Sequence, residues 1–232
     1  MNKREQQKLI REQKQQAAAK KTVAQKKIST IAMVVLIPVL VIGILYGILG
    51  QGTVYPPDQI ADSDHVKGNP DGVKLMVYAD FQCPACAAEH QMVSMAWPRI
   101  ANQVQLAFRH YPLTSTHRFA WTAALYAEAA GAQGKFWEMY DQLFLNQAYW
   151  STLTSVDAEF DGYLEQLGLD VAQAHNDMQS DVIIQKIRND QRGGTRAGVR
   201  GTPALFVNGR LTPVPQNPAD LIALVNRAAS PK

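Results

Sequence analysis

Cysteine is rare in this sequence, which has two in 232 residues. So few cysteines exclude a small scaffold held together by several disulfides, and 12 prolines with 15 glycines are too few for a collagen-like or low-complexity chain. Acidic residues are scarce in residues 1–30, which hold nine Lys/Arg and two Asp/Glu, a net charge of +7. Residues 31–232 hold 14 Lys/Arg and 18 Asp/Glu, a net charge of −4. We therefore do not expect this body of the chain to bind nucleic acid. We interpret residues 1–30 as a solvated basic cytoplasmic tail, with an RNA-binding or protein-docking tail as the alternative.

Charged residues are absent between Lys27 and Asp58. Within this interval, residues 31–49 form an apolar run that would span roughly 28 Å as a helix, close to the thickness of a bilayer core. The run predicts a single transmembrane helix. A cleaved signal peptide is the alternative, but its apolar region is usually about 7–15 residues long and ends at a small-residue cleavage site that is poor here. No cysteine follows the run, which excludes a lipoprotein anchor.

The basic residues that precede this run predict its orientation, because positive charge stays on the cytoplasmic side. The amino terminus is then cytoplasmic, and the body lies in the periplasm or an equivalent extracytoplasmic space. Disulfides persist in such compartments. Residues 50–70 are polar, contain prolines and lack periodicity, so we interpret them as a linker between the membrane and residues 71–232.

The pattern of residues 71–232 predicts an α/β domain. Apolar, β-branched runs predict four strands, at 73–81, 104–108, 204–208 and 211–214. Helical spacing predicts six helices, at 85–100, 119–131, 135–146, 157–167, 171–193 and 218–228, with a glycine-rich loop at 193–201. The first and last parts of the domain are expected to share one sheet. The stretch 114–195 is too long for a single crossover and predicts an inserted helical subdomain.

The two cysteines, Cys83 and Cys86, form a C-x-x-C motif where a strand gives way to a helix. At the helix N-terminus, free N–H groups and the helix dipole favour the thiolate of Cys83. Cys86 lies one turn further in and is expected to be shielded, so Cys83 attacks and Cys86 resolves. A structural disulfide is one alternative, although so short a loop contributes little stability.

A metal site is the other alternative for this motif, because His90 lies one helical turn after Cys86 and the three side chains offer three ligands. The remaining histidines have no ligand spacing and are expected to lie at the surface or to form hydrogen bonds: His65, His110, His117 and His175. We therefore expect neither a metal nor another cofactor.

Thr202 and Pro203 stand directly before a predicted strand. Together with C-x-x-C, this position predicts a cis peptide bond facing the cysteines. The backbone of Thr202 would then pair with an extended substrate segment in the manner of an added strand. Asp80, three residues before Cys83, is expected to cap the turn, and a role in proton transfer is the alternative.

The combination of motifs resembles the DsbA-like branch of the thioredoxin superfamily, in particular its membrane-anchored bacterial members. The matching stretches lie between residues 65 and 210: HVKGNPDGVKLMVYADFQCPAC, FRHYPL, AGAQGKFWEMYDQLFLNQ and GVRGTPALFVNGR. The resemblance implies a thioredoxin-like fold with an inserted helical subdomain. It also implies that Cys83 is the nucleophile, Cys86 the resolving cysteine and Pro203 the cis-proline.

By the same resemblance, Thr202 and the residues between the cysteines, Pro84 and Ala85, contact the substrate. Ala85 departs from the best-known periplasmic oxidase of the family, which has histidine there, and one source of thiolate stabilisation is lost.

These observations predict a membrane-anchored thiol:disulfide oxidoreductase that oxidises cysteine-containing exported proteins. The resemblance implies a quinone-linked membrane partner that reoxidises the cysteine pair. The alternatives are a disulfide reductase or isomerase of the same superfamily, and a metal-binding chaperone.

Overall fold

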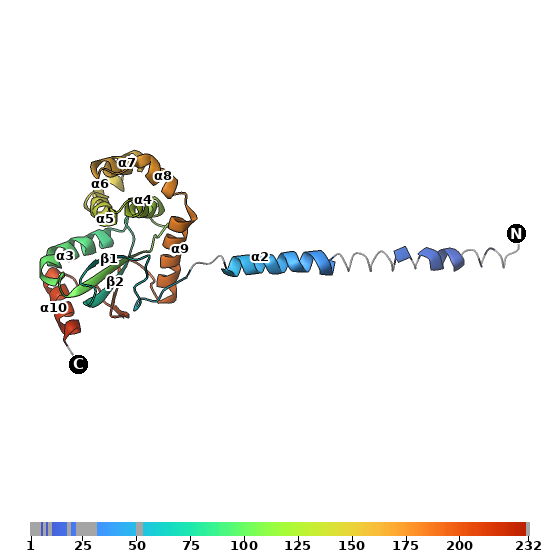
Figure 1. Cartoon of the computed structure of the whole chain (residues 1–232), viewed down its shortest axis with the longest axis horizontal. Coiled ribbons are helices and arrows are strands. Elements are labelled where there is room, and N and C mark those ends of the chain that lie inside the picture. Colours follow the sequence, from blue (N-terminus) through green and yellow to red (C-terminus); the bar gives the residue numbers. More distant parts are fainter. Residues whose placement is uncertain are drawn as a thin grey trace. The chain divides into compact units, whose positions relative to one another are not determined.

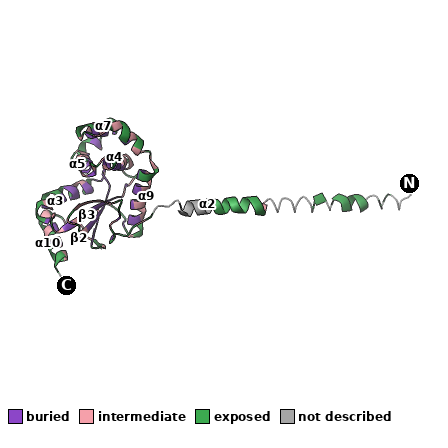
Figure 2. Cartoon of the chain, viewed as in Figure 1, coloured by how far each residue is buried: buried purple, intermediate pink, exposed green. Residues whose placement is uncertain are grey.

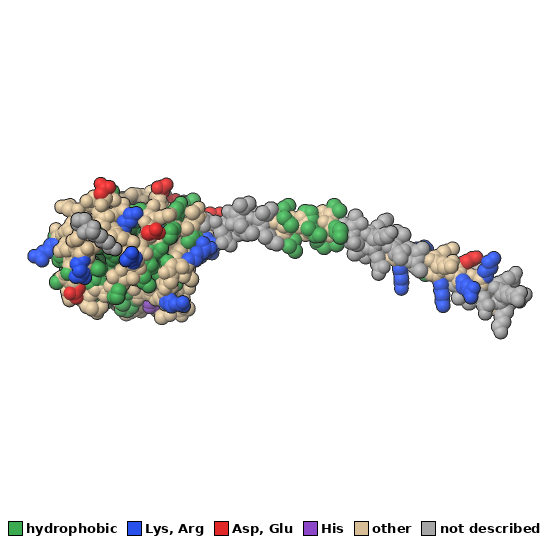
Figure 3. Space-filling model, turned by 90° about the horizontal axis from the view of Figure 1, so that it is seen from below, with side chains coloured by type: hydrophobic (Ala, Val, Ile, Leu, Met, Phe, Trp, Pro, Cys, Tyr) green, Lys and Arg blue, Asp and Glu red, His purple; other side chains and the backbone are tan. Residues whose placement is uncertain are grey.

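The computed structural model describes residues 32–49 and 53–230, together with residues 6, 8, 11–17, 20 and 21 (Figure 1). The chain divides into two units, Met1–Gln51 and Gly52–Lys232. The described residues of the first unit carry basic side chains that precede the apolar stretch (Figure 3).

The apolar stretch contains a π-helix, η1 (Ala32–Leu36), followed by helix α2 (Ile37–Leu49). Pro38 has no N–H to donate to the carbonyl group of Val34, and the hydrogen-bonding pattern changes at this point. In the part of the chain that the structure describes, no helix is both long enough and apolar enough to cross a membrane. The transmembrane helix predicted over 31–49 is therefore not confirmed, and Ile31 lies outside the described residues.

Five strands form one mixed sheet in the second unit, in the order β1-β3-β2-β4-β5. The central pair, β2 and β3, is parallel, and all other pairs are antiparallel. The strands are β1 (His65–Gly68), β2 (Val73–Ala79), β3 (Val104–His110), β4 (Ala204–Val207) and β5 (Arg210–Thr212). Asn208 and Gly209 both have positive φ, at 48° and 78°, which is the conformation that the predicted Asn-Gly hairpin turn requires.

Eight helices of this unit are described. Some of them cover the sheet, and the others form a separate group beside it (Figure 1). Helices α3 and α10 pack together against one face, whereas α9 packs against β3. The bounds are α3 (Pro84–Ile100), α4 (Ala120–Ala132), α5 (Phe136–Leu145), α6 (Gln147–Trp150), α7 (Asp157–Gln166), α8 (Val171–Asp177), α9 (Asp181–Arg196) and α10 (Pro218–Ala229). The predicted α/β domain with helices inserted between two strands of one sheet is confirmed.

The core lies on both faces of the sheet, and buried residues concentrate there and in the helices that cover it (Figure 2). Successive residues of β2 alternate between the faces. Leu75 and Val77 join the larger cluster, which includes residues of α3, α5 and α10. Met76 and Tyr78 join a smaller cluster with Phe206 on the other face. Because both faces are covered, β2 reads in the sequence as a nearly continuous apolar run.

The prediction of a linker over 50–70 is corrected for residues 53–70. These residues pack on the domain and contain strand β1. Buried Arg109 holds them: its guanidinium donates to both carboxylate oxygens of Asp64, at 2.9 and 2.8 Å, and to the carbonyl oxygens of Tyr55 and Gln59, both at 2.8 Å. A buried guanidinium needs many acceptors, and this polar segment supplies them.

The helix predicted over 171–193 is two helices. Asp170 accepts a hydrogen bond from Gln173 N–H at the start of α8, and Ser180 accepts one from Ile183 N–H at the start of α9. Each cap satisfies an N–H group that a helix start leaves without a partner. The second cap therefore marks a new helix start inside the predicted range.

The predicted glycine-rich loop at 193–201 is helical up to Arg196. A Cβ atom on Gly194 would lie 2.8 Å from a ring carbon of Tyr78 and 2.9 Å from one of Tyr111. Glycine therefore allows α9 to approach these two aromatic rings closely, and it does not indicate a loop here.

Candidate active site

The cysteine pair lies where β2 gives way to α3. Cys83 is the N-cap residue of α3, and Pro84 occupies the first turn, where a missing N–H costs nothing. The carbonyl oxygen of Cys83 accepts the N–H groups of Cys86 and Ala87 at 3.0 and 3.2 Å. Cys83 is 7% exposed and Cys86 is fully buried, and both are free thiols in the structure. As predicted, Cys83 stands at the helix N-terminus and Cys86 is shielded.

The two thiols have opposite pKa shifts. A hydrogen bond from the side chain of Cys86 lowers the pKa of Cys83 to about 5, supported by the backbone N–H groups of Cys86 and Ala85, against the effect of burial. Burial raises the pKa of Cys86 far above its ordinary value, and the neighbouring sulfur of Cys83 raises it further. One sulfur is therefore a thiolate at neutral pH while the other keeps its proton.

The peptide bond between Thr202 and Pro203 is cis, as predicted. It faces the cysteines: Cys83 Sγ lies 3.5 Å from the carbonyl oxygen of Thr202. The Thr202 hydroxyl oxygen is buried and has no hydrogen-bond partner in the structure. The geometry thus brings Cys83 together with Thr202 and Pro203, which are distant in the sequence.

The turn before Cys83 is fixed by Asp80. One carboxylate oxygen of this buried residue accepts the N–H of Gln82 at 2.7 Å. The other accepts the N–H of Leu113 and the Nδ1–H of His117, both at 2.8 Å. The capping role expected for Asp80 agrees with this arrangement, because its carboxylate satisfies donors on both sides of the turn.

Gln147, at the start of α6, also holds this turn. Its side-chain amide donates to the carbonyl oxygens of Phe81 and Cys83 at 2.7 and 2.8 Å. The sequence analysis did not assign a role to this residue. The available signal was that Gln147 ends one of the stretches that resemble the family, but no local pattern indicates which backbone groups it reaches.

The ligand set considered for a metal is used differently in the structure. His90 Nε2 lies 2.8 Å from a carboxylate oxygen of Asp141, and its ring stacks on Phe144. Among the described residues there is no group of three His, Cys, Asp or Glu side chains that could hold a metal ion. Each of the other histidines lies within hydrogen-bond distance of a carboxylate: His65 and His110 of Glu128, His117 of Asp80, and His175 of Asp161.

A cavity of about 280 Å³ lies beside the cysteine pair. Residues of α3, the cis-proline and the segment between β5 and α10 line it: Ala85, Ala88, Glu89, Met92, Pro203, Val214, Pro215 and Gln216. Ala85 and Pro203 are thus placed at one surface, as predicted for residues that contact a substrate. Glu89 was not predicted, since a glutamate in a helix gives no sign in the sequence that it will be buried.

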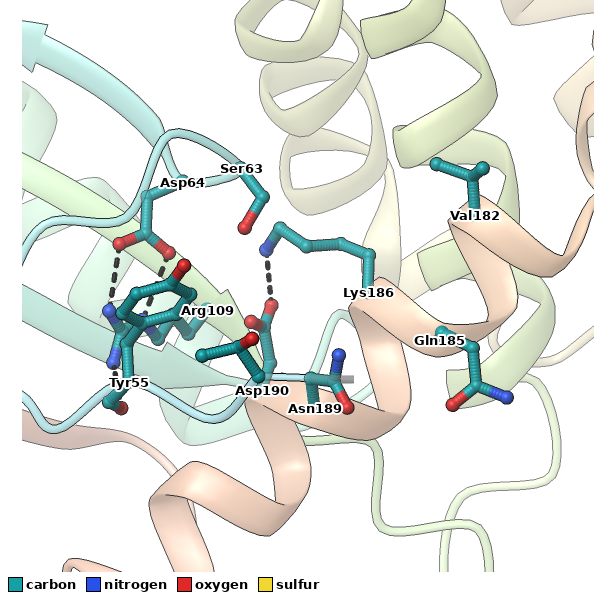
Figure 4. Close-up of a pocket in the computed structure, with 10 residues that line it drawn as sticks. Tyr55, Ser63, Asp64, Arg109, Val182, Gln185, Lys186, Asn189 and Asp190 are labelled. Carbon is teal, nitrogen blue, oxygen red and sulfur yellow. Dashed lines mark hydrogen bonds and ion pairs between the residues drawn. The ribbon is translucent and has the colours of Figure 1, made fainter. Parts of the chain in front are cut away.

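A second cavity, of about 160 Å³, lies at α9 and contains neither cysteine (Figure 4). Its charged residues are paired with one another. Lys186 donates to Asp190 at 2.5 Å, and Arg109 contacts Asp64 as described above. Removal of one partner of such a buried pair would leave the other charge uncompensated.

Residues 61–227 match the family model described as thioredoxin. The chain belongs to the thioredoxin family. Within this family its fold is that of the DsbA-like thiol-disulfide oxidoreductases, as solved structures show. A thioredoxin-like oxidoreductase from Silicibacter pomeroyi superposes with a TM-score of 0.60 at 24% identity, covering 74% of this chain and 95% of that one.

Two further members of this fold group cover most of their own length. The Wolbachia pipientis protein α-DsbA1 has a TM-score of 0.64 at 16% identity and covers 73% of this chain and 92% of its own. BdbD from Bacillus subtilis has a TM-score of 0.64 at 13% identity, and the match covers 77% of this chain and 99% of BdbD. At such identities the comparison establishes the fold of this thioredoxin-family chain.

Curated relatives of this thioredoxin-family chain are much longer proteins. The Na(+)/H(+) antiporter NhaA 1 of Salinispora arenicola is 35% identical over 170 residues, which is 73% of this chain and 24% of that protein. The Na(+)/H(+) antiporter NhaA 3 of Salinispora tropica is 36% identical over 168 residues, which is 72% of this chain and 25% of that protein. The chain therefore spans about a quarter of the length of these relatives. The antiporter name belongs to the whole of each longer protein, and the match covers only that quarter.

Proposed function

We propose that this chain is a thiol-disulfide oxidase that introduces disulfides into cysteine-containing exported proteins. The observation that carries the proposal is the low pKa of Cys83 at the start of α3, with buried Cys86 behind it and the backbone of Thr202 3.5 Å from its sulfur. Reactive cysteines combine a stabilised thiolate with access for a partner thiol. Of the two sulfurs, that of Cys83 has the stabilised thiolate, and Cys83 is the more exposed residue, at 7% against 0% for Cys86.

The reaction transfers two electrons from the substrate to the cysteine pair. A substrate thiolate attacks Cys83 Sγ of the Cys83–Cys86 disulfide, the S–S bond breaks, and Cys86 leaves with the electron pair and takes up a proton. The substrate is then joined to Cys83 by a mixed disulfide. A second substrate thiolate attacks the substrate sulfur of this bond, the substrate disulfide forms, and Cys83 leaves as a thiolate.

The stability of the reduced cysteine pair favours electron transfer from the substrate to this chain. A disulfide is more oxidising when its reduced form is stabilised, and Cys83 is a good leaving group because its thiolate is stable near pH 7. Ala85 supplies no imidazole, but the hydrogen bond from Cys86 is the largest contribution to the low pKa. The stabilisation therefore comes from the pair itself and from the backbone N–H groups at the start of α3.

The reduction potential of the Cys83–Cys86 pair tests this proposal. We expect the full-length chain, equilibrated in detergent solution against glutathione buffers, to have a potential more positive than about −180 mV. About 30 mV corresponds to a tenfold change in the equilibrium with a substrate dithiol. A potential more negative than about −250 mV would instead indicate a reductase, and the Cys83→Ser variant controls for nonspecific signal.

The reduced pair must be reoxidised for a second turnover. We assign this step to a quinone-linked redox partner in the membrane, since the chain's own residues supply two thiols and no other electron acceptor. The partner's disulfide would accept the two electrons from Cys83 and Cys86 by the same exchange chemistry. The chain itself requires no cofactor for this cycle.

The compartment forms part of the proposal. An apolar run at 31–49 and nine basic residues before it support a single-pass anchor in the inner membrane, with a cytoplasmic amino terminus and the thioredoxin-like domain outside. Protease added to spheroplasts should therefore digest the domain while an amino-terminal epitope stays protected. Protection of both ends until the cells are lysed would place the domain in the cytoplasm.

A further inference from the structure

The cavity beside Pro203 has apolar walls and one ionisable group. Ala85, Ala88, Met92, Val214 and Pro215 form most of its lining. These side chains offer no hydrogen bond, so they suit the carbon chain of a long side chain. Ala85 directly precedes the buried cysteine, and Pro203 follows the residue whose carbonyl group contacts Cys83. A substrate joined to Cys83 therefore brings its neighbouring residues to this cavity.

Glu89 is the ionisable group. It lies on α3, six residues after Cys83, and is 4% exposed. Its carboxylate oxygen Oε2 is buried and has no hydrogen-bond partner in the structure. Burial raises the pKa of Glu89 to about 7, against the opposing charge of Lys67. A buried carboxylate oxygen that lacks a partner is unusual in a folded protein and calls for an explanation.

Lys67 does not take that place, because other groups hold its ammonium. Its Nζ atom lies over three aromatic rings, 4.8 Å from the ring centroid of Trp97, 4.3 Å from that of Trp137 and 5.5 Å from that of Tyr140. Each ring presents its negative face to the cation. The charges of Asp141 and Glu89 also act on Lys67, but no hydrogen bond joins Lys67 to Glu89 Oε2. The position of Lys67 is thus set by the aromatic rings, and Glu89 keeps an oxygen without a donor.

We propose that this cavity binds a basic side chain of the substrate, Lys or Arg, within two residues of the reacting cysteine, and that Glu89 pairs with its positive charge. The proposal rests on the oxidase function above and names the substrate class. The methylene groups of the basic residue pack on the apolar walls, and its head group donates to the carboxylate. An apolar side chain would fill the walls but leave Glu89 without a partner, and an acidic one would place two carboxyl groups together.

Peptide oxidation by the full-length disulfide form tests this inference. The probes are two-cysteine peptides that are identical except for one residue beside the first cysteine, which is Lys, norleucine, Gln or Glu. Each oxidation rate is divided by the rate at which the same peptide reduces oxidised glutathione, because a neighbouring charge alters the reactivity of a thiol. We expect the Lys peptide to react about tenfold faster than the norleucine peptide, and Glu89→Gln to reduce this ratio to about one.

Glu138→Gln is the matched control, because Glu138 is an exposed glutamate that pairs with Lys135 outside the cavity. This variant should keep the preference for the Lys peptide. Equal normalised rates for all four peptides in the unmodified chain, or a preference that survives in Glu89→Gln, would overturn the inference while the oxidase function stands.

A second measurement separates this inference from the function on which it rests. If the chain oxidises none of the peptides, the oxidase proposal fails, and binding of cysteine-free peptides then decides the inference. In these peptides serine replaces each cysteine. Tighter binding of the Lys peptide than of the norleucine peptide, lost in Glu89→Gln and kept in Glu138→Gln, supports the cavity as a site for basic side chains. Equal binding of both peptides contradicts it.

Discussion

With Cys83 first joined to glutathione by a mixed disulfide, replacement of Cys86 by serine should trap substrate thiols on Cys83, because glutathione leaves as the thiolate and no second thiol of the chain displaces the substrate. In the unmodified chain the buried Cys86 thiol lies beside Cys83, and we expect it to displace such a substrate within the molecule. Intramolecular attack has a large kinetic advantage over attack by a second molecule, so the lifetime of the adduct should increase at least about a hundredfold in the variant. Non-reducing gels followed by mass spectrometry of the trapped species measure this increase.

Cys83→Ser provides the opposite control for this experiment. It keeps a cysteine in the chain but removes the accessible sulfur, so we expect no adducts and no exchange activity. Adducts that form through Cys86 in this variant would show that the buried sulfur is reached by substrates, and the assignment of the two roles would then be wrong.

Alkylation of the reduced chain should depend on pH in the way that a Cys83 pKa of about 5 requires. The rate with iodoacetamide is expected to be nearly constant above pH 6 and to fall about tenfold per pH unit below pH 5, because only the thiolate reacts. An ordinary thiol with a pKa of about 8.5 would have only about one molecule in 300 in the thiolate form at pH 6. A midpoint near pH 8.5 for Cys83 would contradict the proposed stabilisation.

The same shift links the stability of the reduced chain to pH. The pKa of Cys83 is lower in the folded chain than its ordinary value, so the thiolate stabilises the folded state. This contribution is complete above pH 9 and is lost as the pH falls to about 5. Cys86→Ala, which removes the hydrogen-bond donor, should move the alkylation midpoint toward higher pH and reduce this dependence.

The sequence was sufficient to predict the strands around the cysteines, the helical insertion and the cis-proline. These predictions depend on local signals: apolar runs, the C-x-x-C spacing at a strand end, and proline before a strand. The positions of Cys83 and Cys86 at the start of α3 follow from the same signals. The structure places both as expected.

The remaining features depend on contacts between distant residues, which local patterns do not contain. Residues 53–70 look like a linker because they are polar, yet they supply the acceptors for Arg109, about 50 residues away. Gly194 looks like part of a loop, yet it allows α9 to approach Tyr78. Glu89 looks like an ordinary surface residue of a helix. Only the folded structure shows that its carboxylate oxygen Oε2 is buried and that Glu89 lines a cavity.

Gln147 has a consequence for how this fold is assembled. It belongs to the inserted helices, but its amide satisfies two carbonyl groups of the thioredoxin core, those of Phe81 and Cys83. Excision of residues 120–196 would leave the carbonyl group of Phe81 without this donor, at a cost of about 1–3 kcal/mol if it stays buried, whereas the carbonyl group of Cys83 keeps the N–H groups of Cys86 and Ala87. The insertion is therefore not a detachable module: the polypeptide that forms the redox turn and the helices that fix it have to be acquired, exchanged or lost together.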